Sequence, residues 1–166
     1  ASLSAAATYL AVAVLGGLVM LMGIFLLQSE LGTLKISGLS AAAAECADKK
    51  MLYAAGVCML FGFGAKAGVF PLHIWLPKAH PVAPAPASAL LSGILTKTGI
   101  YGILIITCRL FPLDAYWCRL VLALGVITMF GGALLALFSI DLKRTLACSS
   151  MSQIGFILVG IGMLGF

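Results

Sequence analysis

The sequence has very few charged side chains. Asp, Glu, Lys and Arg make up 9% of its 166 residues, against about 25% in an average soluble domain. Hydrophobic residues make up 63%, and the mean hydropathy is +1.18. Such a chain lacks the polar surface that a water-exposed globule needs, whereas the core of a bilayer needs none. The composition therefore excludes an ordinary soluble fold and indicates a polytopic membrane protein.

Motifs for cofactors, metals and nucleic acid are also absent. The five cysteines include no C-x-x-C pair, which excludes the usual iron–sulfur and zinc-ribbon patterns. The net charge of +5 comes from scattered cations, so nucleic acid is not an expected partner. No cationic segment precedes the first apolar run, so we expect no cleaved signal peptide. We expect no cofactor and no metal ion in this chain.

The sparse charges divide the chain into five apolar runs. Runs of about 20 residues are long enough for helices that cross the hydrocarbon core of a bilayer. The chain begins without Met and stops inside the last run, so we interpret it as one membrane domain, a piece of a longer protein. The fold class predicted is all-α, a polytopic membrane helix bundle. The expected spans cover residues 8–29, 51–77, 87–108, 120–140 and 145–166.

The second run contains a lysine beside a helix breaker. Lys66 comes immediately before Gly68 and Pro71, and proline cannot continue a helix because it lacks the backbone donor. We therefore expect a discontinuous helix near Lys66–Pro71. Broken helices at membrane depth free backbone carbonyls, which are tolerated where they line an ion pathway. Lys66 is a candidate proton carrier on this argument.

The third run has a lysine at its centre. Lys97 is the eleventh of the 22 residues from Ala87 to Cys108, and a lysine at the midplane costs about 2.5 to 3.5 kcal/mol to insert. Such a residue is expected to have a function, because desolvation favours the neutral amine and brings proton exchange toward cellular pH. Ser92 and Tyr101 would add polar groups beside it. The alternative for both lysines is a static ion pair with a carboxylate on another helix.

Two histidines follow Lys66 at steps of seven residues, His73 and His80. An unbroken helix would place all three side chains on one face, but the two prolines between them weaken that alignment. No third ligand is near in sequence, so a metal site is not expected. The alternative is that each is a structural histidine near the membrane interface.

Two stretches carry a family resemblance. Residues 66–102, KAGVFPLHIWLPKAHPVAPAPASALLSGILTKTGIYG, closely resemble the antiporter-like subunits of respiratory complex I. Similar proteins occur in membrane-bound hydrogenases and in multisubunit sodium/proton antiporters. Residues 141–155, DLKRTLACSSMSQIG, resemble the motif that opens a later helix in that family. The two stretches occur in the order that the family requires.

The resemblance implies a larger fold of about fourteen helices with two inverted repeats, each containing a discontinuous helix. This chain would supply the sixth to tenth helices. Lys66 falls on the family's lysine at the first helix break, and Lys97 on the central lysine one helix later. The glutamate that pairs with the first lysine would lie upstream of this piece, and the second half-channel would lie downstream.

The resemblance also implies a function. The chain would translocate protons by protonation and deprotonation of buried lysines, within an NADH:quinone oxidoreductase or a membrane-bound hydrogenase. It would carry no flavin, iron–sulfur or quinone chemistry itself. Expected partners are other membrane subunits, protons or sodium ions, and the lipid of a bacterial or archaeal plasma membrane. Three alternatives are a sodium/proton antiporter subunit without redox coupling, a structural membrane anchor, and a membrane enzyme that uses His73 and His80.

Overall fold

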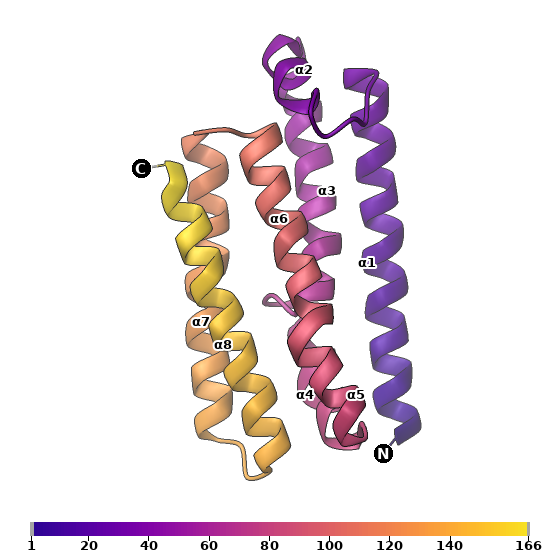
Figure 1. The fold of residues 1–166 in the computed structure, drawn as a ribbon, viewed down its shortest axis with the longest axis vertical. Helices are drawn as coiled ribbons and strands as arrows, with labels where there is room; N and C mark the ends of the chain where they lie inside the picture. The colour runs from indigo at the N-terminus through magenta and orange to yellow at the C-terminus, as the bar shows by residue number, and fades with distance from the viewer. Residues whose placement is uncertain (1, 166) are drawn as a thin grey trace.

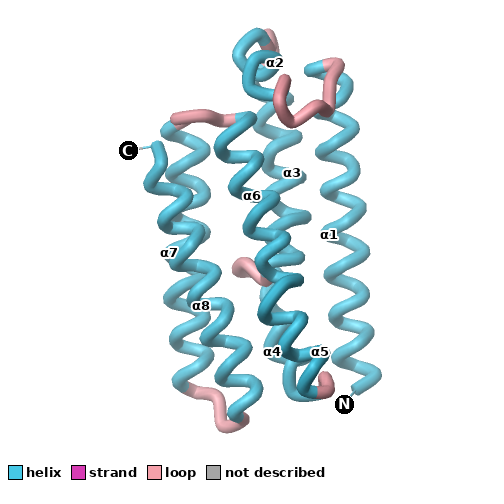
Figure 2. Tube along the Cα trace, in the orientation of Figure 1, coloured by secondary structure: helices cyan, strands magenta, loops and turns pink. Residues whose placement is uncertain are grey.

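The computed structural model describes residues 2–165. Within these residues the regular elements are all helices (Figures 1 and 2). Five helical segments are long and apolar enough to cross a membrane: Ser2–Leu31, Lys49–Val82, Ala85–Leu110, Ala115–Leu137 and Leu142–Gly165. The prediction of an all-α bundle with five spans is therefore confirmed.

The elements in chain order are α1 (Ser2–Leu31), α2 (Leu39–Glu45), α3 (Lys49–Ala67), η1 (Leu72–Ile74), α4 (Trp75–Val82), α5 (Ala85–Leu90), the π-helical segment η2 (Leu91–Leu95), α6 (Thr96–Leu110), α7 (Ala115–Leu137), α8 (Leu142–Gly162) and η3 (Met163–Gly165). In Figure 1, α3 and α6 lie at the centre, with α1 on one side and the α7–α8 pair on the other. The short helix α2 covers one end of the bundle and is not a span.

Glycines bring the long helices close together. A Cβ atom at Gly62 of α3 would lie 2.6 Å from the carbonyl oxygen of Gly16 on α1. On α8, a Cβ at Gly155 would lie 2.3 Å from the backbone nitrogen of Met129 on α7. Small residues at such contacts let helix backbones pack directly in a membrane, where no hydrophobic effect holds helices together. These glycines therefore fix the spacing of the α1–α3 and α7–α8 pairs.

The second span is discontinuous, as predicted. Helix α3 ends at Ala67, and Gly68 follows in the left-handed conformation with φ +80°. Glycine adopts this conformation without the steric cost of a Cβ atom. The chain then passes through Val69, Phe70 and Pro71, where the Phe70–Pro71 peptide bond is cis, before η1 and α4 resume the span. Figure 2 shows the break as a loop midway along the bundle.

Several expected limits of the spans shift. Pro77 and Pro81 lie inside α4 and Pro86 near the start of α5, so the proline-rich connection shrinks to residues 83–84. Pro77 is tolerated because it lies in the first turn of α4, where a backbone N–H is often unpaired. The fourth span runs over Ala115–Leu137 rather than 120–140.

Aromatic rings near the span ends were expected either at the membrane interface or in packing. Trp75 and Trp117 are each only 1% exposed. The Trp75 indole N–H donates to the Ala65 carbonyl at 2.8 Å, and the Trp117 indole N–H donates to Thr107 Oγ1 at 3.0 Å. Both tryptophans therefore pack inside the bundle.

Asp114 joins three elements at the end of the bundle near α2. Its Oδ1 accepts the backbone N–H groups of Tyr116 and Trp117, both at 3.0 Å, which begins α7. Its Oδ2 accepts the hydroxyl of Tyr53 on α3. Partial burial works to raise the pKa of Asp114, but these hydrogen bonds and the charge of Lys49 outweigh it and hold the pKa below 3.8.

We predict that Asp114→Asn lowers the thermal stability of the full-length protein at neutral pH. A carboxyl with a depressed pKa stabilises the fold above its unfolded pKa and loses that contribution as the pH falls through the folded value. The gap in thermal midpoint between wild type and Asp114→Asn should therefore shrink below about pH 4. Thermal unfolding in detergent across pH measures this. A gap that stays constant with pH would contradict the role of the carboxylate charge.

We also predict that Gly155→Ala destabilises the protein by about 1–3 kcal/mol, the usual cost of overpacking. The added methyl would meet backbone atoms of α7, which cannot move aside as a flexible side chain can. Gly160→Ala on the same helix is the matched control, because nothing lies within 4 Å of a Cβ there. Thermal midpoints and the amounts inserted in membranes should fall for Gly155→Ala alone. Equal behaviour of the two variants would show that the α7–α8 spacing tolerates a methyl group.

Candidate functional site

A cavity lies at the helix break, between α1, α3, α4 and α6. Its volume is about 330 Å³. The residues that line it are Tyr9, Ala13, Gly17, Met20, Gly62, Phe63, Ala65, Lys66, Trp75, Leu95 and Thr98. Lys66 is the only charged residue among them. Liquid water takes about 30 Å³ per molecule, so the cavity has room for several waters.

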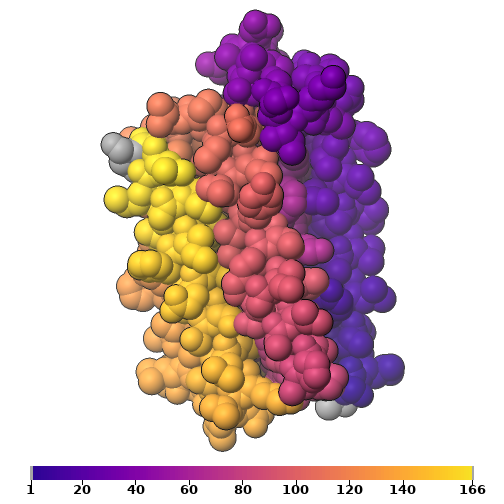
Figure 3. All heavy atoms as spheres, viewed as in Figure 1, coloured from indigo at the N-terminus to yellow at the C-terminus, as the bar shows by residue number. Residues whose placement is uncertain are grey.

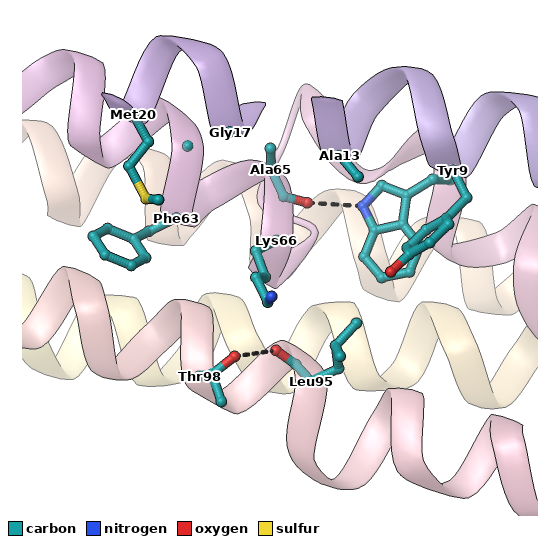
Figure 4. A pocket seen from close by; sticks show the side chains of 11 residues that line it. Tyr9, Ala13, Gly17, Met20, Phe63, Ala65, Lys66, Leu95 and Thr98 are labelled. Carbon is teal, nitrogen blue, oxygen red and sulfur yellow. Dashed lines mark hydrogen bonds between the residues drawn. The ribbon is translucent and has the colours of Figure 1, made fainter. Parts of the chain in front are cut away.

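Lys66 enters this cavity from the last turn of α3. Figure 4 shows its side chain extending from α3 toward Leu95 and Thr98 on the neighbouring helix. The hydroxyl of Thr98 donates to the Leu95 carbonyl at 2.7 Å. Lys66 lies near the middle of the 34-residue segment Lys49–Val82. An amine at this depth therefore faces a hollow with polar atoms on its opposite wall.

The backbone at the break is held from both sides. The amides of Gly68 and Val69 both donate to the Gly64 carbonyl at 2.9 Å, and the Leu72 amide donates to Val69 at 2.7 Å. The indole of Trp75 on α4 reaches back across the break to Ala65, the residue before Lys66. Tyr9 of α1 contacts the same indole edge-on, with ring centroids 5.1 Å apart. The position of Lys66 is thus fixed by backbone bonds and by a buried tryptophan.

Lys97 lies midway along the 26-residue segment Ala85–Leu110, directly after the π-helical segment. No residue pattern predicted this segment. The Lys97 ammonium donates to the backbone carbonyl of Ser92, which also accepts the Thr96 hydroxyl at 3.2 Å. Lys97 is exposed and does not line the Lys66 cavity, although Leu95 and Thr98 on the same segment do. The two lysines therefore occupy different faces of this segment.

The face that carries Lys97 is uncovered. Figure 3 shows α6 at the surface of the molecule, between α1 and α8. Leu90, Ile94 and Tyr101 are 59%, 60% and 64% exposed and follow the helical spacing of Lys97. A lysine at mid-depth on an exposed apolar stripe is costly in contact with lipid.

The histidines lie apart from Lys66. His80 is buried in α4, and its Nδ1 lies 2.6 Å from the Ser88 hydroxyl of α5. His73 lies in η1, stacks on Phe70 with ring centroids 5.3 Å apart, and lines a separate cavity with Lys78, Asp141 and Arg144. Neither histidine lines the Lys66 cavity. The break separates them from Lys66, because the chain reverses its helical register at residues 68–71.

The remaining polar candidates have distinct partners. Ser92 Oγ lies 3.0 Å from Ser150 Oγ on α8, which in turn donates to Leu146 at 3.0 Å. Tyr101 projects from the uncovered face of α6. Pro71 precedes η1 and lines an apolar hollow on the other side of the break. Within residues 2–165 no three His, Cys, Asp or Glu side chains are placed to hold a metal ion.

The carboxylates all lie at the ends of helices. Glu30 is in the last turn of α1, Glu45 ends α2, and Asp48, Asp114 and Asp141 precede the first residues of α3, α7 and α8. No carboxylate within residues 2–165 therefore lies inside a span, at the depth of Lys66 or Lys97. Sequence analysis could not identify Tyr9, Trp75 and Thr98 as cavity residues, because only tertiary packing brings them to Lys66.

Comparison with known proteins places these features in a family. The profile of the family described as NADH:quinone oxidoreductase/Mrp antiporter, transmembrane, matches residues 1–166. Hydrogenase-4 component B of Escherichia coli (strain K12) is 39% identical over 165 residues, which is 98% of this chain and 24% of that protein. NAD(P)H-quinone oxidoreductase chain 4 2 of Thermosynechococcus vestitus is 48% identical over 107 residues, 63% of this chain and 20% of that protein.

A solved structure has the same fold. A chain in the structure of the Mrp complex from Dietzia sp. DQ12-45-1b superposes with a TM-score of 0.90 and 32% sequence identity, over 97% of this chain and 30% of that one. The chain spans about a quarter of the length of its hydrogenase relative. The matched motifs, the five spans and the broken helix agree, and the chain belongs to the NADH:quinone oxidoreductase/Mrp antiporter transmembrane family as an antiporter-like membrane subunit.

Proposed function

We propose that this chain carries the proton-transfer lysines of an antiporter-like subunit in a redox-driven membrane complex. The observation that carries the proposal is the position of Lys66, an amine at mid-depth, beside a helix break and facing a cavity of about 330 Å³. Broken helices that line cavities are the usual ion sites of membrane transporters. Water in the cavity would connect the amine to further proton carriers.

Lys97 is the second proton carrier in this proposal. Its uncovered stripe on α6 is where the parts of the longer protein outside residues 1–166 would pack, because lipid does not accommodate an amine at the midplane. The carboxylate that pairs with each lysine would also come from outside this chain, since its own five acidic residues lie at helix ends. A paired carboxylate favours the protonated amine and separation from it favours release, so movement of the partner would load and unload the lysine.

The proposed setting is the plasma membrane of a bacterium or archaeon, with other membrane subunits as partners. The similarity to hydrogenase-4 component B and to an NAD(P)H-quinone oxidoreductase chain supports coupling to a redox module in partner chains. A second candidate is sodium/proton exchange without redox coupling, which the likeness to a chain of the Mrp complex favours. Both candidates use the same lysines.

We predict that Lys66→Ala and Lys97→Ala each reduce proton transport by the assembled complex by about tenfold or more, the scale on which proton-transfer groups act. Lys66→Arg and Lys97→Arg should fail as well, because guanidinium keeps its proton at any accessible pH. Proton uptake into vesicles containing the assembled complex is the measurement, with Lys50→Ala as the control. Lys50 lies in the first turn of α3, outside both sites.

The driving force in the same vesicles separates the two candidates. Uptake that requires an electron donor and acceptor supports redox coupling, whereas uptake driven by an imposed sodium gradient alone supports exchange. Wild-type transport by all four lysine variants would overturn both, and would leave the structural anchor as the function.

A further inference from the structure

A threonine of α7 reaches the helix break from outside the cavity. Thr128 is 0% exposed. Its Oγ1 accepts the backbone N–H of Phe70 at 3.1 Å and donates to the Leu124 carbonyl of its own helix at 2.6 Å. The hydroxyl hydrogen is used within α7, so a lone pair faces the break. Thr128 is thereby the acceptor for a backbone donor that lies 58 residues earlier in the chain.

The backbone donors of the break show why this contact is needed. Gly68, Val69 and Leu72 donate to carbonyls of the break itself or of α3, and Pro71 has no N–H. Phe70 is therefore the one residue from 68 to 72 whose amide donates to another helix. An unpaired amide at this depth is costly because no bulk water replaces the lost acceptor. Thr128 supplies the tertiary hydrogen bond that fixes the backbone of the break.

The position of Thr128 is itself rigid. It lies between Gly125 and Gly132, at which a Cβ would come within 2.7 Å and 2.6 Å of backbone nitrogens on α8. The close α7–α8 pair therefore sets the depth and rotation of the hydroxyl. Phe70 is only four residues beyond Lys66, and the two are joined through the short turn that ends α3. Displacing the Phe70 amide would shift the end of α3 and the amine that it carries.

We propose that Thr128 is a positioning residue for Lys66: by accepting the Phe70 amide it holds the helix break, and through the break it sets the environment of the Lys66 amine in its cavity. The inference rests on the proposed function of Lys66. A threonine that served stability alone would affect assembly, whereas a positioning residue also changes how transport depends on pH.

The chain offers a matched control. Thr107 on α6 is 2% exposed, donates to the Ile103 carbonyl at 2.9 Å and accepts the Trp117 indole N–H at 3.0 Å. It thus has the same chemistry as Thr128, with one bond within its helix and one from another segment, but it does not line the Lys66 cavity. Valine at either position keeps the shape and removes the hydroxyl.

The test compares Thr128→Val, Thr128→Ser and Thr107→Val in the full-length protein within its assembled complex. We expect Thr128→Val to lower proton uptake by about tenfold, the scale of one lost buried hydrogen bond, and to shift the pH of half-maximal uptake. Thr128→Ser keeps the acceptor and should restore rate and pH profile to within about twofold. Thr107→Val should assemble less well but keep the wild-type pH profile.

Combination with Lys66→Ala separates this inference from the function on which it rests. Adding Thr128→Val to Lys66→Ala should cause no further loss of transport. If Lys66→Ala alone transports normally, the proposed function fails. If Lys66→Ala is inactive but Thr128→Val has the rate and pH profile of wild type, only the role of Thr128 is overturned.

A variant that does not assemble still leaves a decision. Thr128→Cys keeps a similar volume with sulfur, a weaker acceptor. The inference requires its pH profile to differ from that of Thr128→Ser, and identical profiles for the cysteine, serine and wild-type proteins would overturn it.

Discussion

The structure depends on one constraint: backbone polar groups inside a bilayer have no water with which to bond. A helix satisfies them automatically, so a break at mid-depth requires other partners. Here the Gly64 carbonyl takes two amides, the Trp75 indole takes the carbonyl of Ala65, and Thr128 takes the amide of Phe70. Helices α4 and α7 thus supply the partners that α3 loses where it ends.

The same break determines the electrostatics of the site. Lys66 lies where α3 stops, in a cavity whose lining holds no other charge, and Lys97 lies where a π-helical segment returns to α-helix. Both lysines are thus placed where the helix is irregular and near the centre of a span. All acidic side chains lie at the bundle ends, so the charge that opposes each amine is left to the rest of the longer protein.

Much of the fold could be predicted from the sequence because its signals are local. Apolar runs bounded by charges predict five spans, and Gly68 with Pro71 after Lys66 predicts the break. The separation of His73 and His80 from the Lys66 cavity could not be predicted, because it depends on the path of the chain through the break. Trp75, Thr98 and Thr128 were missed for the same reason: each acts across helices, and no spacing in the sequence records it. The early start of α7 had a local signal in Asp114.

The central claim is that the Lys66 amine exchanges protons through water in its cavity with a carboxylate from outside residues 1–166. A structure of the complete complex during turnover, at a resolution that shows ordered waters, tests it most directly. The account predicts ordered waters in the cavity beside Lys66 and a carboxylate within reach of them on a neighbouring helix. A dry cavity, with apolar side chains between the amine and every carboxylate in each state observed, would contradict it.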